Sequence, residues 1–410
     1  LGKEHLNAFI SIIGQENVDV SAYSRARCSF GGGMVDSFRL RQHLIENIPD
    51  AVLAPRSVED IQAILAYCLA NKIPLYVFGA GSGVTRGTEA VCRGVSLDMS
   101  KHMNRCLGFS EINQTITVQA GMFGPVLEDL LNHAPEKFNA SRSYTCGNFP
   151  QSFQYSSVGG WVVTRGAGQN STYYGKIEDM VLSQTYVTLS GLLETPAYPR
   201  CATGPDFNQI MMGSDGCFGI LTSVTLRIFR YMPENTHRFS FLFRDWDSAI
   251  SAAREIMQSQ FGFPSVFRLS DPEETDVAMR TYHIHDSPAD TLLKTLGYQP
   301  GKRCLLLGSS DGDASFTRLV ARKVTAIARR HHAFPLTPFQ VTRTWEKSRF
   351  TDPYLCEDLM DFGIWIDTLE CAVTWEQVPS VYAQVRAFVK SHPHTICMTH
   401  LSHCYPQGTN

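Results

Sequence analysis

The sequence predicts an α+β protein that is divided into two domains. Three observations favour this fold class: a length of 410 residues, glycine-rich loops alternating with short strands and helices in the first half, and a change of pattern after Pro233. A chain of this length exceeds what one hydrophobic core usually organises. We therefore expect an N-terminal segment at residues 1–45, a first domain at 46–232 and a second domain at 233–410.

The composition argues against several classes of protein. A formal net charge of −3 and the absence of long Lys/Arg runs disfavour a nucleic-acid binder, which needs a concentrated positive surface. No stretch approaches the roughly 18 uninterrupted apolar residues of a membrane-spanning helix. The 12 cysteines are scattered singly without a CxxC pair, which predicts free thiols in a reducing compartment rather than a disulfide framework.

A cluster of metal-ligating residue types lies near the C-terminal end of the sequence. Cys397, His400, His403 and Cys404 occur within eight residues. We expect them in a strand, where residues two apart share a face and where His400 and His403 therefore point in opposite directions. This geometry disfavours a metal site, and we predict none.

The first domain is expected to alternate helices with buried strands. Ser57 and Asp60 resemble a capping box, and apolar residues recur behind them at helical spacing through residues 58–69. A second short helix is predicted at residues 125–131, beginning with Pro125. Short apolar runs predict strands at residues 73–78, 95–99 and 116–120.

The second domain is expected to be a sheet whose strands are linked by helices. The spacing of apolar residues predicts helices at residues 250–257, 319–327 and 381–389. Because each helix links two strands, the pattern favours a sheet covered on one face. The predicted strands are residues 239–243, 266–269, 305–308, 364–373 and 395–401.

A glycine-rich loop follows the predicted strand at residues 73–78. Small residues at 79–83 allow several backbone N–H groups to face the pyrophosphate of a cofactor such as FAD without any cation. The glycines fall at GxGxG and position 84 is Val, so the GxGxxG fingerprint of a Rossmann NAD site is absent. Taken alone, the pattern is equally compatible with a tight turn.

Two further glycine-rich stretches occur in the same domain. At residues 158–168, VGGWVVTRGAG packs glycines between apolar residues, which suits backbone passing close to a ligand rather than a regular helix or strand. At residues 213–228, glycines run into an alternating apolar pattern that predicts a strand. Three such loops in one domain indicate a cofactor site.

Four stretches, in this order along the chain, carry a family resemblance. They are VFGAGSGV at Val77–Val84, QSFQYSSVGGWVVTRGAG at Gln151–Gly168, YGKIEDMV at Tyr174–Val181 and TGPDFNQIMMGSDGCFGILTSVTLRI at Thr203–Ile228. Together they resemble the flavin domain of the alkyldihydroxyacetonephosphate synthases, and the likeness spans most of the chain. It implies the vanillyl-alcohol oxidase type of flavoprotein: a PCMH-type FAD-binding domain of two α/β subdomains, followed by an incomplete antiparallel-sheet cap domain.

The resemblance also implies which residues bind FAD. The first stretch would hold the pyrophosphate, the next would line the flavin, and the last would complete its site. Many relatives attach flavin to a histidine in the first loop; this loop has none, so we expect FAD bound without a covalent bond. The implied residues are Val77, Phe78, Gly79, Ala80, Gly81, Ser82, Gly83, Gln151, Ser152, Phe153, Gln154, Tyr155, Ser156, Ser157, Thr164, Arg165, Gly166, Ala167, Asp215, Gly216, Cys217, Phe218, Gly219, Ile220 and Leu221.

The activity implied by the resemblance is an alkyl transfer in ether-lipid biosynthesis. In that family the acyl chain of acyl-dihydroxyacetone phosphate is exchanged for a fatty alcohol, with the flavin as a covalent handle and no net redox change. Arg268 matches an active-site arginine of the family, and its planar guanidinium suits phosphate or developing charge. An ion pair with Asp271 or Glu273 is the alternative role for Arg268.

The sequence departs from the family at three places. Asn148 stands where the family has a histidine proposed as acid/base, and Asn cannot take a proton at neutral pH. Cys356 stands where the family has a phosphate-binding arginine, which Arg349 would replace if both lay on one helical face. The family's catalytic tyrosine and histidine-rich motif lie beyond SHCYPQG. We therefore expect a C-terminally truncated chain that binds FAD at best weakly and exchanges alkyl groups poorly or not at all.

Two other functions remain open from the sequence. The chain is alternatively an FAD-linked oxidase or dehydrogenase of a 2-hydroxy acid such as D-lactate or glycolate, or an inactive FAD-binding homologue. Besides acyl-dihydroxyacetone phosphate and fatty alcohol, a homodimer and peripheral membrane contact are open as partners, and nucleic acid is not expected. We expect an intracellular protein, peroxisomal in a eukaryote and otherwise cytoplasmic, although no targeting signal is visible.

Overall fold

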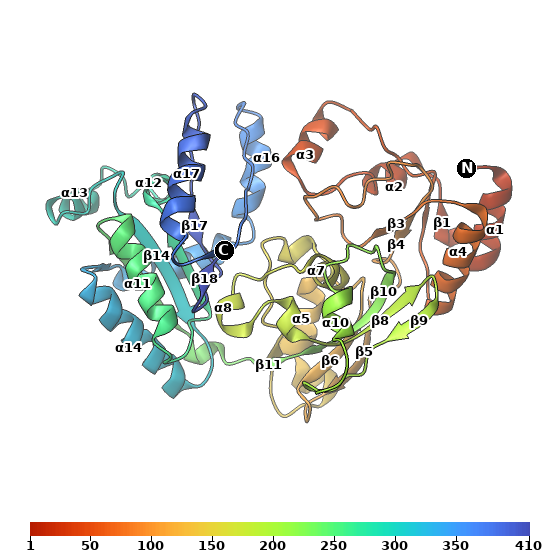
Figure 1. Ribbon diagram of the computed structural model, residues 1–410, viewed down its shortest axis with the longest axis horizontal. Helices are drawn as coiled ribbons and strands as arrows, with labels where there is room; N and C mark the ends of the chain where they lie inside the picture. Colours follow the sequence, from red (N-terminus) through yellow and green to blue (C-terminus); the bar gives the residue numbers. More distant parts are fainter. The chain divides into compact units, whose positions relative to one another are not determined.

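A computed structural model describes residues 1–410, apart from the side chain of Pro353. The chain folds into two compact units, which are labelled by their helices and strands in Figure 1. The first unit comprises Leu1–Gly168, Lys176–Tyr231 and Phe350–Asp367, and the second comprises Gln169–Gly175, Met232–Arg349 and Thr368–Asn410.

The first unit is built on two main sheets with short helices around them. Its strands are β1 (Val18–Asp19), β2 (Ala51–Leu53), β3 (Leu75–Phe78), β4 (Val95–Asp98), β5 (Cys106–Ser110), β6 (Thr115–Gln119), β7 (Tyr144–Thr145), β8 (Val181–Thr188), β9 (Gly191–Glu194), β10 (Ile220–Arg227) and β11 (Phe229–Arg230). Its α-helices are α1 (Lys3–Ile13), α2 (Ala22–Arg27), α3 (Met34–Arg41), α4 (Val58–Asn71), α5 (Gly124–Asn132), α6 (Ala134–Phe138), α7 (Val158–Thr164), α9 (Ile177–Met180), α10 (Phe207–Met211) and α16 (Leu355–Met360). Its 3₁₀ helices are η1 (Gln15–Asn17), η2 (Phe153–Tyr155) and η5 (Asp352–Tyr354).

The smaller sheet of this unit has the order β1-β2-β4-β3. Strands β2 and β3 both run parallel to β4, so the chain leaves β3 at the same edge as it leaves the other two. Helix α4 begins at Ser57, whose side chain accepts the N–H of Asp60, and it buries Ile61 and Ile64 in the core under this sheet. Parallel strands and helix together fix where the loop after β3 begins.

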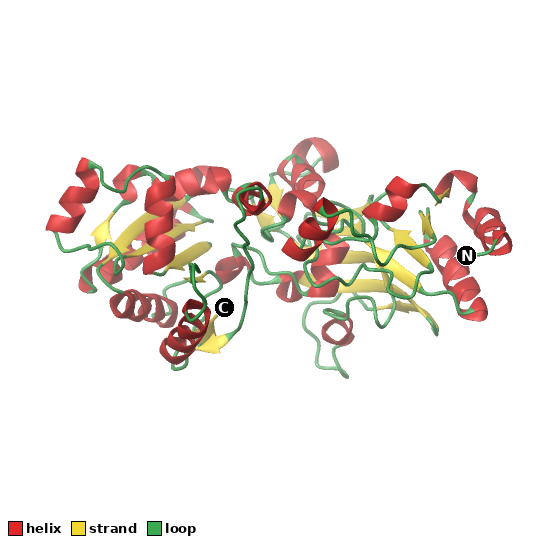
Figure 2. Ribbon diagram, turned by 90° about the horizontal axis from the view of Figure 1, so that it is seen from above, coloured by secondary structure: helices red, strands yellow, loops and turns green.

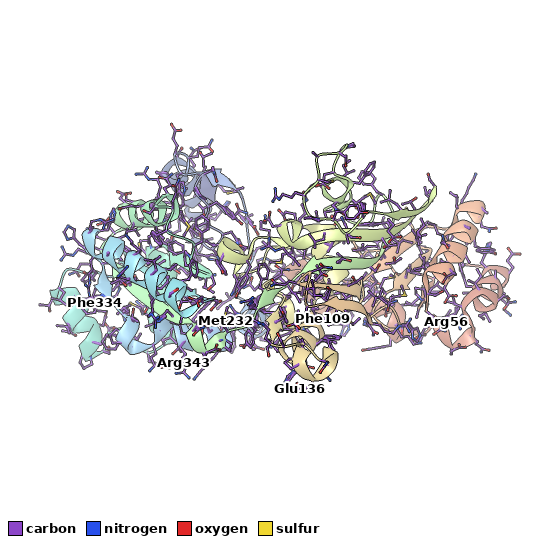
Figure 3. All side chains as sticks on the ribbon, turned by 90° about the horizontal axis from the view of Figure 1, so that it is seen from below. Arg56, Phe109, Glu136, Met232, Phe334 and Arg343 are labelled. Carbon is purple, nitrogen blue, oxygen red and sulfur yellow. The ribbon has the colours of Figure 1, made fainter. Side chains whose placement is uncertain are left out.

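The larger sheet has the order β5-β6-β10-β8-β9 and is antiparallel throughout. Its central strand β10 pairs with β6 on one side and β8 on the other, and its first residue, Ile220, pairs with Val187 of β8. At its edge, Phe109 of β5, which Figure 3 labels, stacks on Phe138 of α6 with ring centroids 4.5 Å apart. This stacked pair closes that end of the sheet.

The second unit contains one main sheet and longer helices. Its strands are β12 (His237–Phe243), β13 (Val266–Ser270), β14 (Cys304–Ser310), β15 (Phe334–Pro335), β16 (Val373–Thr374), β17 (His400–Leu401) and β18 (Gly408–Thr409). Its helices are α8 (Ser171–Tyr174), η3 (Pro233–Asn235), α11 (Trp246–Gln258), α12 (Pro272–Thr281), α13 (Pro288–Thr295), α14 (Ala314–Arg330), η4 (Thr337–Phe339), α15 (Val341–Ser348) and α17 (Val378–Lys390).

The main sheet of the second unit has the order β15-β12-β14-β13-β17 and is antiparallel. Helices α11 and α14 pack on one face, against residues such as Phe241. On the other face, Leu242 and Leu305 pack with Met279 of α12 and Leu293 of α13. Figure 2 shows red helices on both sides of these yellow strands. The prediction of one covered face is wrong, because β12 and β14 carry apolar residues on both faces.

Two predicted strands of this unit are much shorter than expected. Of residues 364–373, only Val373 is in a strand, and its partner is the short β18. The rest of the stretch crosses from the first unit to the second at residues 367 and 368, so it cannot be one strand of one sheet. Trp365 is 48% exposed and Leu369 is 79% exposed, so apolar character alone misled the prediction. Of residues 395–401, only His400 and Leu401 pair, with β13.

The glycine-rich stretch at residues 158–168 was expected to be irregular, and this is wrong for its first half. Val158–Thr164 forms helix α7, which begins where the Ser157 side chain accepts the N–H of Gly160. The glycines serve close packing, because a β-carbon at Gly159 would lie 2.7 Å from the Ala120 carbonyl oxygen. Trp161 is buried at helical spacing from Val158, which gives the helix its inward face.

The α+β fold class is confirmed, with two sheet-and-helix parts in the first unit and an antiparallel sheet in the second. The predicted strands before and after the first glycine loop are present as β3, β4 and β6, and the predicted helices as α4, α5, α11, α14 and α17. Among the described residues, no helix combines the length and the apolar character needed to cross a bilayer.

We expect Gly308→Ala to destabilise the second unit by about 1–3 kcal/mol, as overpacking of a filled site does. Gly308 lies opposite Phe239 in the pair of β14 and β12, and an added β-carbon would lie 2.3 Å from Phe239 Cε2 and 2.8 Å from the Val266 carbonyl oxygen. The matched control is Gly108→Ala in β5, where an added β-carbon meets nothing within 4 Å. Equal urea midpoints for Gly308→Ala and the unchanged protein would contradict this packing.

Candidate functional site

The loop at residues 79–83 follows β3 and consists of small residues whose backbone N–H groups could reach a ligand. A β-carbon at Gly79 would lie 2.4 Å from Ser157 Oγ, and Gly81 has a φ of 72°, where glycine is favoured. Within the described part of the chain, the backbone N–H groups of residues 80–83 donate no hydrogen bond. Several unpaired N–H groups on small residues are the donor set that a diphosphate requires.

The segment at residues 151–157 lies against this loop. Ser157 meets Gly79 there and also caps α7 through the N–H of Gly160 at 3.2 Å. Ser156 Oγ accepts the indole N–H of Trp161 at 2.7 Å, and both serines are buried. These two contacts hold the segment in place, so that the position of the loop is fixed from a second side.

Arg165 joins the remaining two segments of the predicted site. It ends α7 with a φ of 54°, and its guanidinium donates to the carbonyl oxygens of Gln209 at 3.0 Å and Met212 at 3.3 Å. The N–H of Asp215 donates to the Val163 carbonyl at 3.0 Å. The residues after α7 and the residues before β10 are therefore tied directly together.

The segment before β10 also approaches the end of β3. Gly216 has a φ of 84°, and a β-carbon there would lie 3.9 Å from Val77 Cγ2. The residues implied to bind FAD, at 77–83, 151–157, 164–167 and 215–221, thus all lie in the first unit and are linked by these contacts. Tyr155, Cys217 and Phe218 are exposed at its surface, while Ile220 and Leu221 are buried in the strand.

Asn148 presents a buried amide without a protein partner. Its side chain is 1% exposed, and neither Oδ1 nor Nδ2 finds a hydrogen-bond partner among the described residues. Gly168 packs so closely that a β-carbon there would lie 2.6 Å from Oδ1. Leaving such a group unsatisfied costs about 1–3 kcal/mol. This amide is therefore available to hydrogen-bond a ligand group.

Glu128 is a titratable group near Asn148 that the sequence analysis missed. Its Oε2 accepts the N–H of Cys146 at 3.0 Å, and Cys146 Sγ donates to the carbonyl oxygen of Asn148 at 3.5 Å. Burial raises the pKa of Glu128 despite its hydrogen bond from Cys146. Two hydrogen bonds therefore connect this carboxyl, whose pKa is raised, to the segment of Asn148. No spacing in the sequence indicates this, since α5 and β7 meet only in the fold.

Cys356 and Arg349 are not on one helical face, so that expectation is wrong. Cys356 is in α16, where burial raises the pKa of its thiol. Arg349 follows the end of α15, and the chain passes from the second unit to the first between residues 349 and 350. The Arg349 guanidinium donates to Asn170 Oδ1 at 3.0 Å. Sequence spacing failed here because two separate helices replace the single one assumed.

Arg268 lies on β13 of the second unit and pairs with Glu274. Its Nη2 is 2.6 Å from Glu274 Oε1 and 2.9 Å from His400 Nδ1. The alternative pairing with Asp271 or Glu273 is wrong, because those two carboxylates contact Arg386. All hydrogen bonds of Arg268 to described residues use Nη2, which leaves Nε and Nη1 for a ligand.

The charges around Glu274 keep it ionised. Burial alone would raise its pKa, but Arg268 and then His400 outweigh burial and hold the pKa well below its usual range. His400 Nδ1 donates to Glu274 Oε1 at 3.1 Å when it carries a proton, and accepts from Arg268 when it does not. His403 instead contacts Ser171 Oγ at 2.6 Å, so the two histidines of the Cys/His cluster serve different partners.

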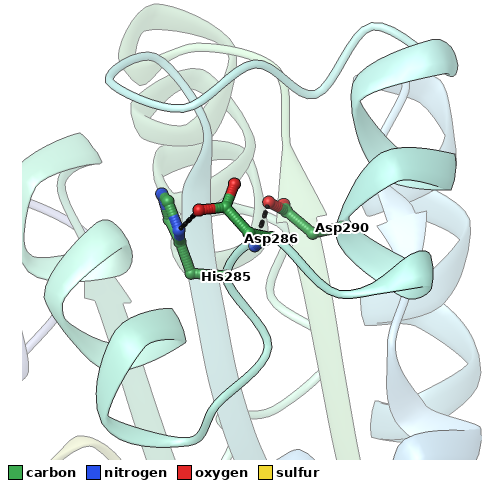
Figure 4. Close-up of side chains that lie close together, drawn as sticks. All are labelled: His285, Asp286 and Asp290. Atoms are coloured by element: carbon green, nitrogen blue, oxygen red, sulfur yellow. Dashed lines mark hydrogen bonds and ion pairs between the residues drawn. The ribbon is translucent and has the colours of Figure 1, made fainter.

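One group of three metal-ligating side chains occurs among the described residues: His285, Asp286 and Asp290 (Figure 4). Asp286 Oδ2 lies 2.8 Å from His285 Nδ1. Asp290 is fully buried and pairs with Arg303 and, at 2.9 Å, with Lys294. Because two protein cations already neutralise Asp290, we assign this group to an ion-pair network. Sequence reasoning missed it because Arg303 joins from a different part of the chain.

Comparison with known proteins identifies the class of this chain. Residues 49–195 match the family model described as FAD binding domain, and residues 232–409 match the one described as FAD linked oxidases, C-terminal domain. The chain therefore combines an FAD-binding domain with a C-terminal domain of the FAD-linked oxidase type. The first domain is thus an FAD-binding domain, and FAD is its cofactor. The unpaired N–H groups of residues 80–83 and the free amide of Asn148 fit such a ligand.

Within this class, the chain is similar to alkyldihydroxyacetonephosphate synthases. It is 28% identical to that of Dictyostelium discoideum over 94% of this chain and 64% of the relative. It is 26% identical to that of Trypanosoma brucei brucei over 92% of this chain and 62% of the relative. The chain thus spans somewhat less than two thirds of the length of these two relatives.

Solved structures agree with this comparison. An alkyldihydroxyacetonephosphate synthase structure matches with a TM-score of 0.84 at 27% identity, covering 100% of this chain and 79% of the other. The 4-ethylphenol oxidase from Gulosibacter chungangensis matches with a TM-score of 0.66 at 16% identity, covering 99% of this chain and 81% of the other, which shows a shared fold. The predicted family resemblance is therefore confirmed.

We expect Glu274→Gln to lower the free energy of unfolding by about 1–3 kcal/mol at pH 7, because a partly buried charge-assisted pair is lost. The pKa of Glu274 in the folded state lies below the ordinary 4.5, so its stabilisation is present above pH 4.5 and is lost as the pH falls further. The difference between the Glu274→Gln variant and the unchanged protein should therefore shrink between pH 7 and pH 3. Glu376→Gln, at an exposed position of the same unit, is the control; a pH-independent difference at position 274 would count against the pair.

Asn148→Leu should stabilise the protein without FAD and weaken FAD binding. A leucine of similar size removes the unsatisfied amide, which raises the free energy of unfolding by about 1 kcal/mol, and also removes the group offered to the ligand. Thermal unfolding of the apoprotein and titration with FAD measure the two effects. Lower stability of the apoprotein, together with unchanged FAD affinity, would show that the amide has a structural partner.

Proposed function

We propose that the protein carrying this chain is an alkylglycerone-phosphate synthase, which exchanges the acyl chain of acyl-dihydroxyacetone phosphate for a fatty alcohol. The products are alkyl-dihydroxyacetone phosphate and the free fatty acid, so no electrons are gained or lost overall. The observation that carries the proposal is the match to alkyldihydroxyacetonephosphate synthase over 94% of this chain. Both domains of the chain take part in that match.

The first unit would hold the cofactor through backbone groups. FAD, when bound, supplies an electron-accepting ring at which the three-carbon unit of the substrate is activated. The N–H groups of residues 80–83 would neutralise its diphosphate, and the amide of Asn148 would hydrogen-bond a ring or substrate oxygen. Because an amide neither gives nor takes a proton at neutral pH, Asn148 orients groups and another residue carries the proton.

Arg268 would bind an anionic group of the substrate. Glu274 and His400 hold its Nη2, which fixes the plane of the guanidinium, and Nε with Nη1 remain as donors. Nε and Nη1 point to different edges of the guanidinium, so each would donate a separate hydrogen bond to an oxygen of an anionic group. The ionised Glu274 offsets part of the positive charge of the Arg268 guanidinium. Arg268 would therefore orient the phosphate as well as attract it.

The test is incorporation of a radiolabelled long-chain alcohol into alkyl-dihydroxyacetone phosphate, with release of one fatty acid for each alcohol incorporated. Arg268→Lys keeps the charge but loses the planar donor set, and we expect it to raise the KM for the phosphate substrate about 10- to 100-fold. Arg318→Lys, on the exposed side of α14, should leave the KM unchanged. The absence of any incorporation by the FAD-loaded protein would sink the proposal.

A second candidate is an FAD-linked oxidoreductase of a 2-hydroxy acid. It is favoured by 29% identity over 374 residues to the uncharacterized FAD-linked oxidoreductase YgcU of Escherichia coli, of which 72% is covered. The glycolate oxidase subunit GlcD of Bacillus subtilis is also similar, at 25% identity. D-lactate or glycolate would bleach the flavin absorbance under this function only. FAD binding without alcohol incorporation and without flavin bleaching would favour an inactive homologue.

A further inference from the structure

A run of three glycines from the N-terminal segment lies directly against the FAD loop. The N–H of Gly32 donates to the carbonyl oxygen of Gly83 at 2.9 Å. A β-carbon at Gly31 would lie only 2.2 Å from that same oxygen, and one at Gly33 would lie 3.3 Å from the carbonyl oxygen of Val84. Two stretches of backbone, about 50 residues apart in the sequence, therefore touch without side chains between them.

Space, and not backbone conformation, requires glycine at these positions. None of Gly31, Gly32 and Gly33 has a positive φ, so their torsion angles are open to any residue. The obstacle to a larger residue is the loop itself. An alanine at residue 31 would have to displace the main chain of Gly83, because a carbonyl oxygen cannot rotate away as a long side chain can.

Ion pairs anchor the glycine run on its other side. Asp36 Oδ2 accepts the N–H of Gly31 at 3.2 Å, and Arg39 contacts both Asp36 and, at 2.7 Å, Glu89. Asp36, Arg39 and Glu89 are all at most 6% exposed. Arg86 adds two further contacts to Glu89, each at 2.8 Å. Residues 79–89 are therefore held at Gly83 by the glycine run and at Glu89 by a buried arginine.

The carboxylate of Glu89 accepts hydrogen bonds from both Arg39 and Arg86. Burial would raise its pKa, but hydrogen bonds from Arg86 and Arg39 lower the pKa to about 2. Since this folded-state pKa lies below the ordinary value of 4.5, the network is intact above pH 4.5 and weakens as the pH falls toward 2. The anchor is thus complete throughout the neutral range.

We propose that residues 30–39 form a brace that positions the diphosphate loop, with Gly31 and Gly32 as positioning residues of the FAD site. The brace engages the carbonyl oxygen of Gly83, which is then not free to face a bound anion, and it holds residues 80–83 so that their N–H groups stay available. These residues lie outside the matched FAD-binding region, which begins at residue 49. The inference rests on FAD binding and is independent of the alkyl exchange.

The first experiment compares Gly31→Ala with Gly87→Ala by titrating the full-length apoprotein with FAD and following flavin fluorescence. Gly87 lies in the same stretch of chain, has no positive φ, and would leave an added β-carbon without a neighbour within 4 Å. We expect Gly31→Ala to raise the FAD dissociation constant about tenfold or more, because the added β-carbon displaces the main chain of Gly83 in the loop. Gly87→Ala should leave the dissociation constant unchanged. An unchanged dissociation constant for a folded Gly31→Ala would overturn the brace.

The second experiment needs no substitution and covers the case in which Gly31→Ala does not fold. Hydrogen exchange of the unchanged protein is measured with and without FAD. The brace predicts added protection at residues 29–33 together with residues 79–84, whereas protection at 79–84 alone would overturn it. If the unchanged protein binds no FAD, the cofactor assignment fails and the brace with it; if FAD binds but no alkyl exchange occurs, only the proposed function fails.

Discussion

Backbone approaching backbone, with no side chain between, is the constraint on which the first unit depends. The main chain of Gly31 meets the carbonyl oxygen of Gly83, and that of Gly159 meets the carbonyl oxygen of Ala120. Glycine lets main-chain groups approach this closely, where a side chain would keep them apart. An anionic cofactor can then be bound by a protein whose net charge is −3, because neutral N–H groups replace the missing cations.

Polar groups of the two units contribute differently. In the first unit, the buried amide of Asn148 is uncharged and has no partner among the described residues, while the buried charges of Asp36, Arg39 and Glu89 pair with one another. In the second unit, the important groups are charged and paired, as in Arg268 with Glu274 and Arg303 with Asp290. An unsatisfied amide offers a new hydrogen bond at little cost in reorganisation, whereas a paired arginine offers orientation. A cofactor ring needs a free hydrogen-bonding group, and a phosphate group needs an oriented arginine.

Local sequence patterns predicted the elements whose character is decided by their own residues. The helix behind Ser57 and the strand before Gly79 are such cases, since capping and apolar residues act within a few positions. The glycine segments could be assigned to one cofactor because several of them occur in a known order. The stretch at residues 364–373 was misjudged, since its apolar residues are divided between two units and stay exposed. The brace at residues 30–39 and the link from Glu128 to Asn148 could not be predicted, because each depends on contacts between distant parts of the chain.

The order of the segments along the chain has a consequence for biosynthesis. The pieces that meet around the cofactor come from residues as early as Gly31 and as late as Gly216, and β10 must then insert between β6 and β8. During translation no earlier length of chain possesses all of these segments, so FAD meets its complete site only after β10 has emerged.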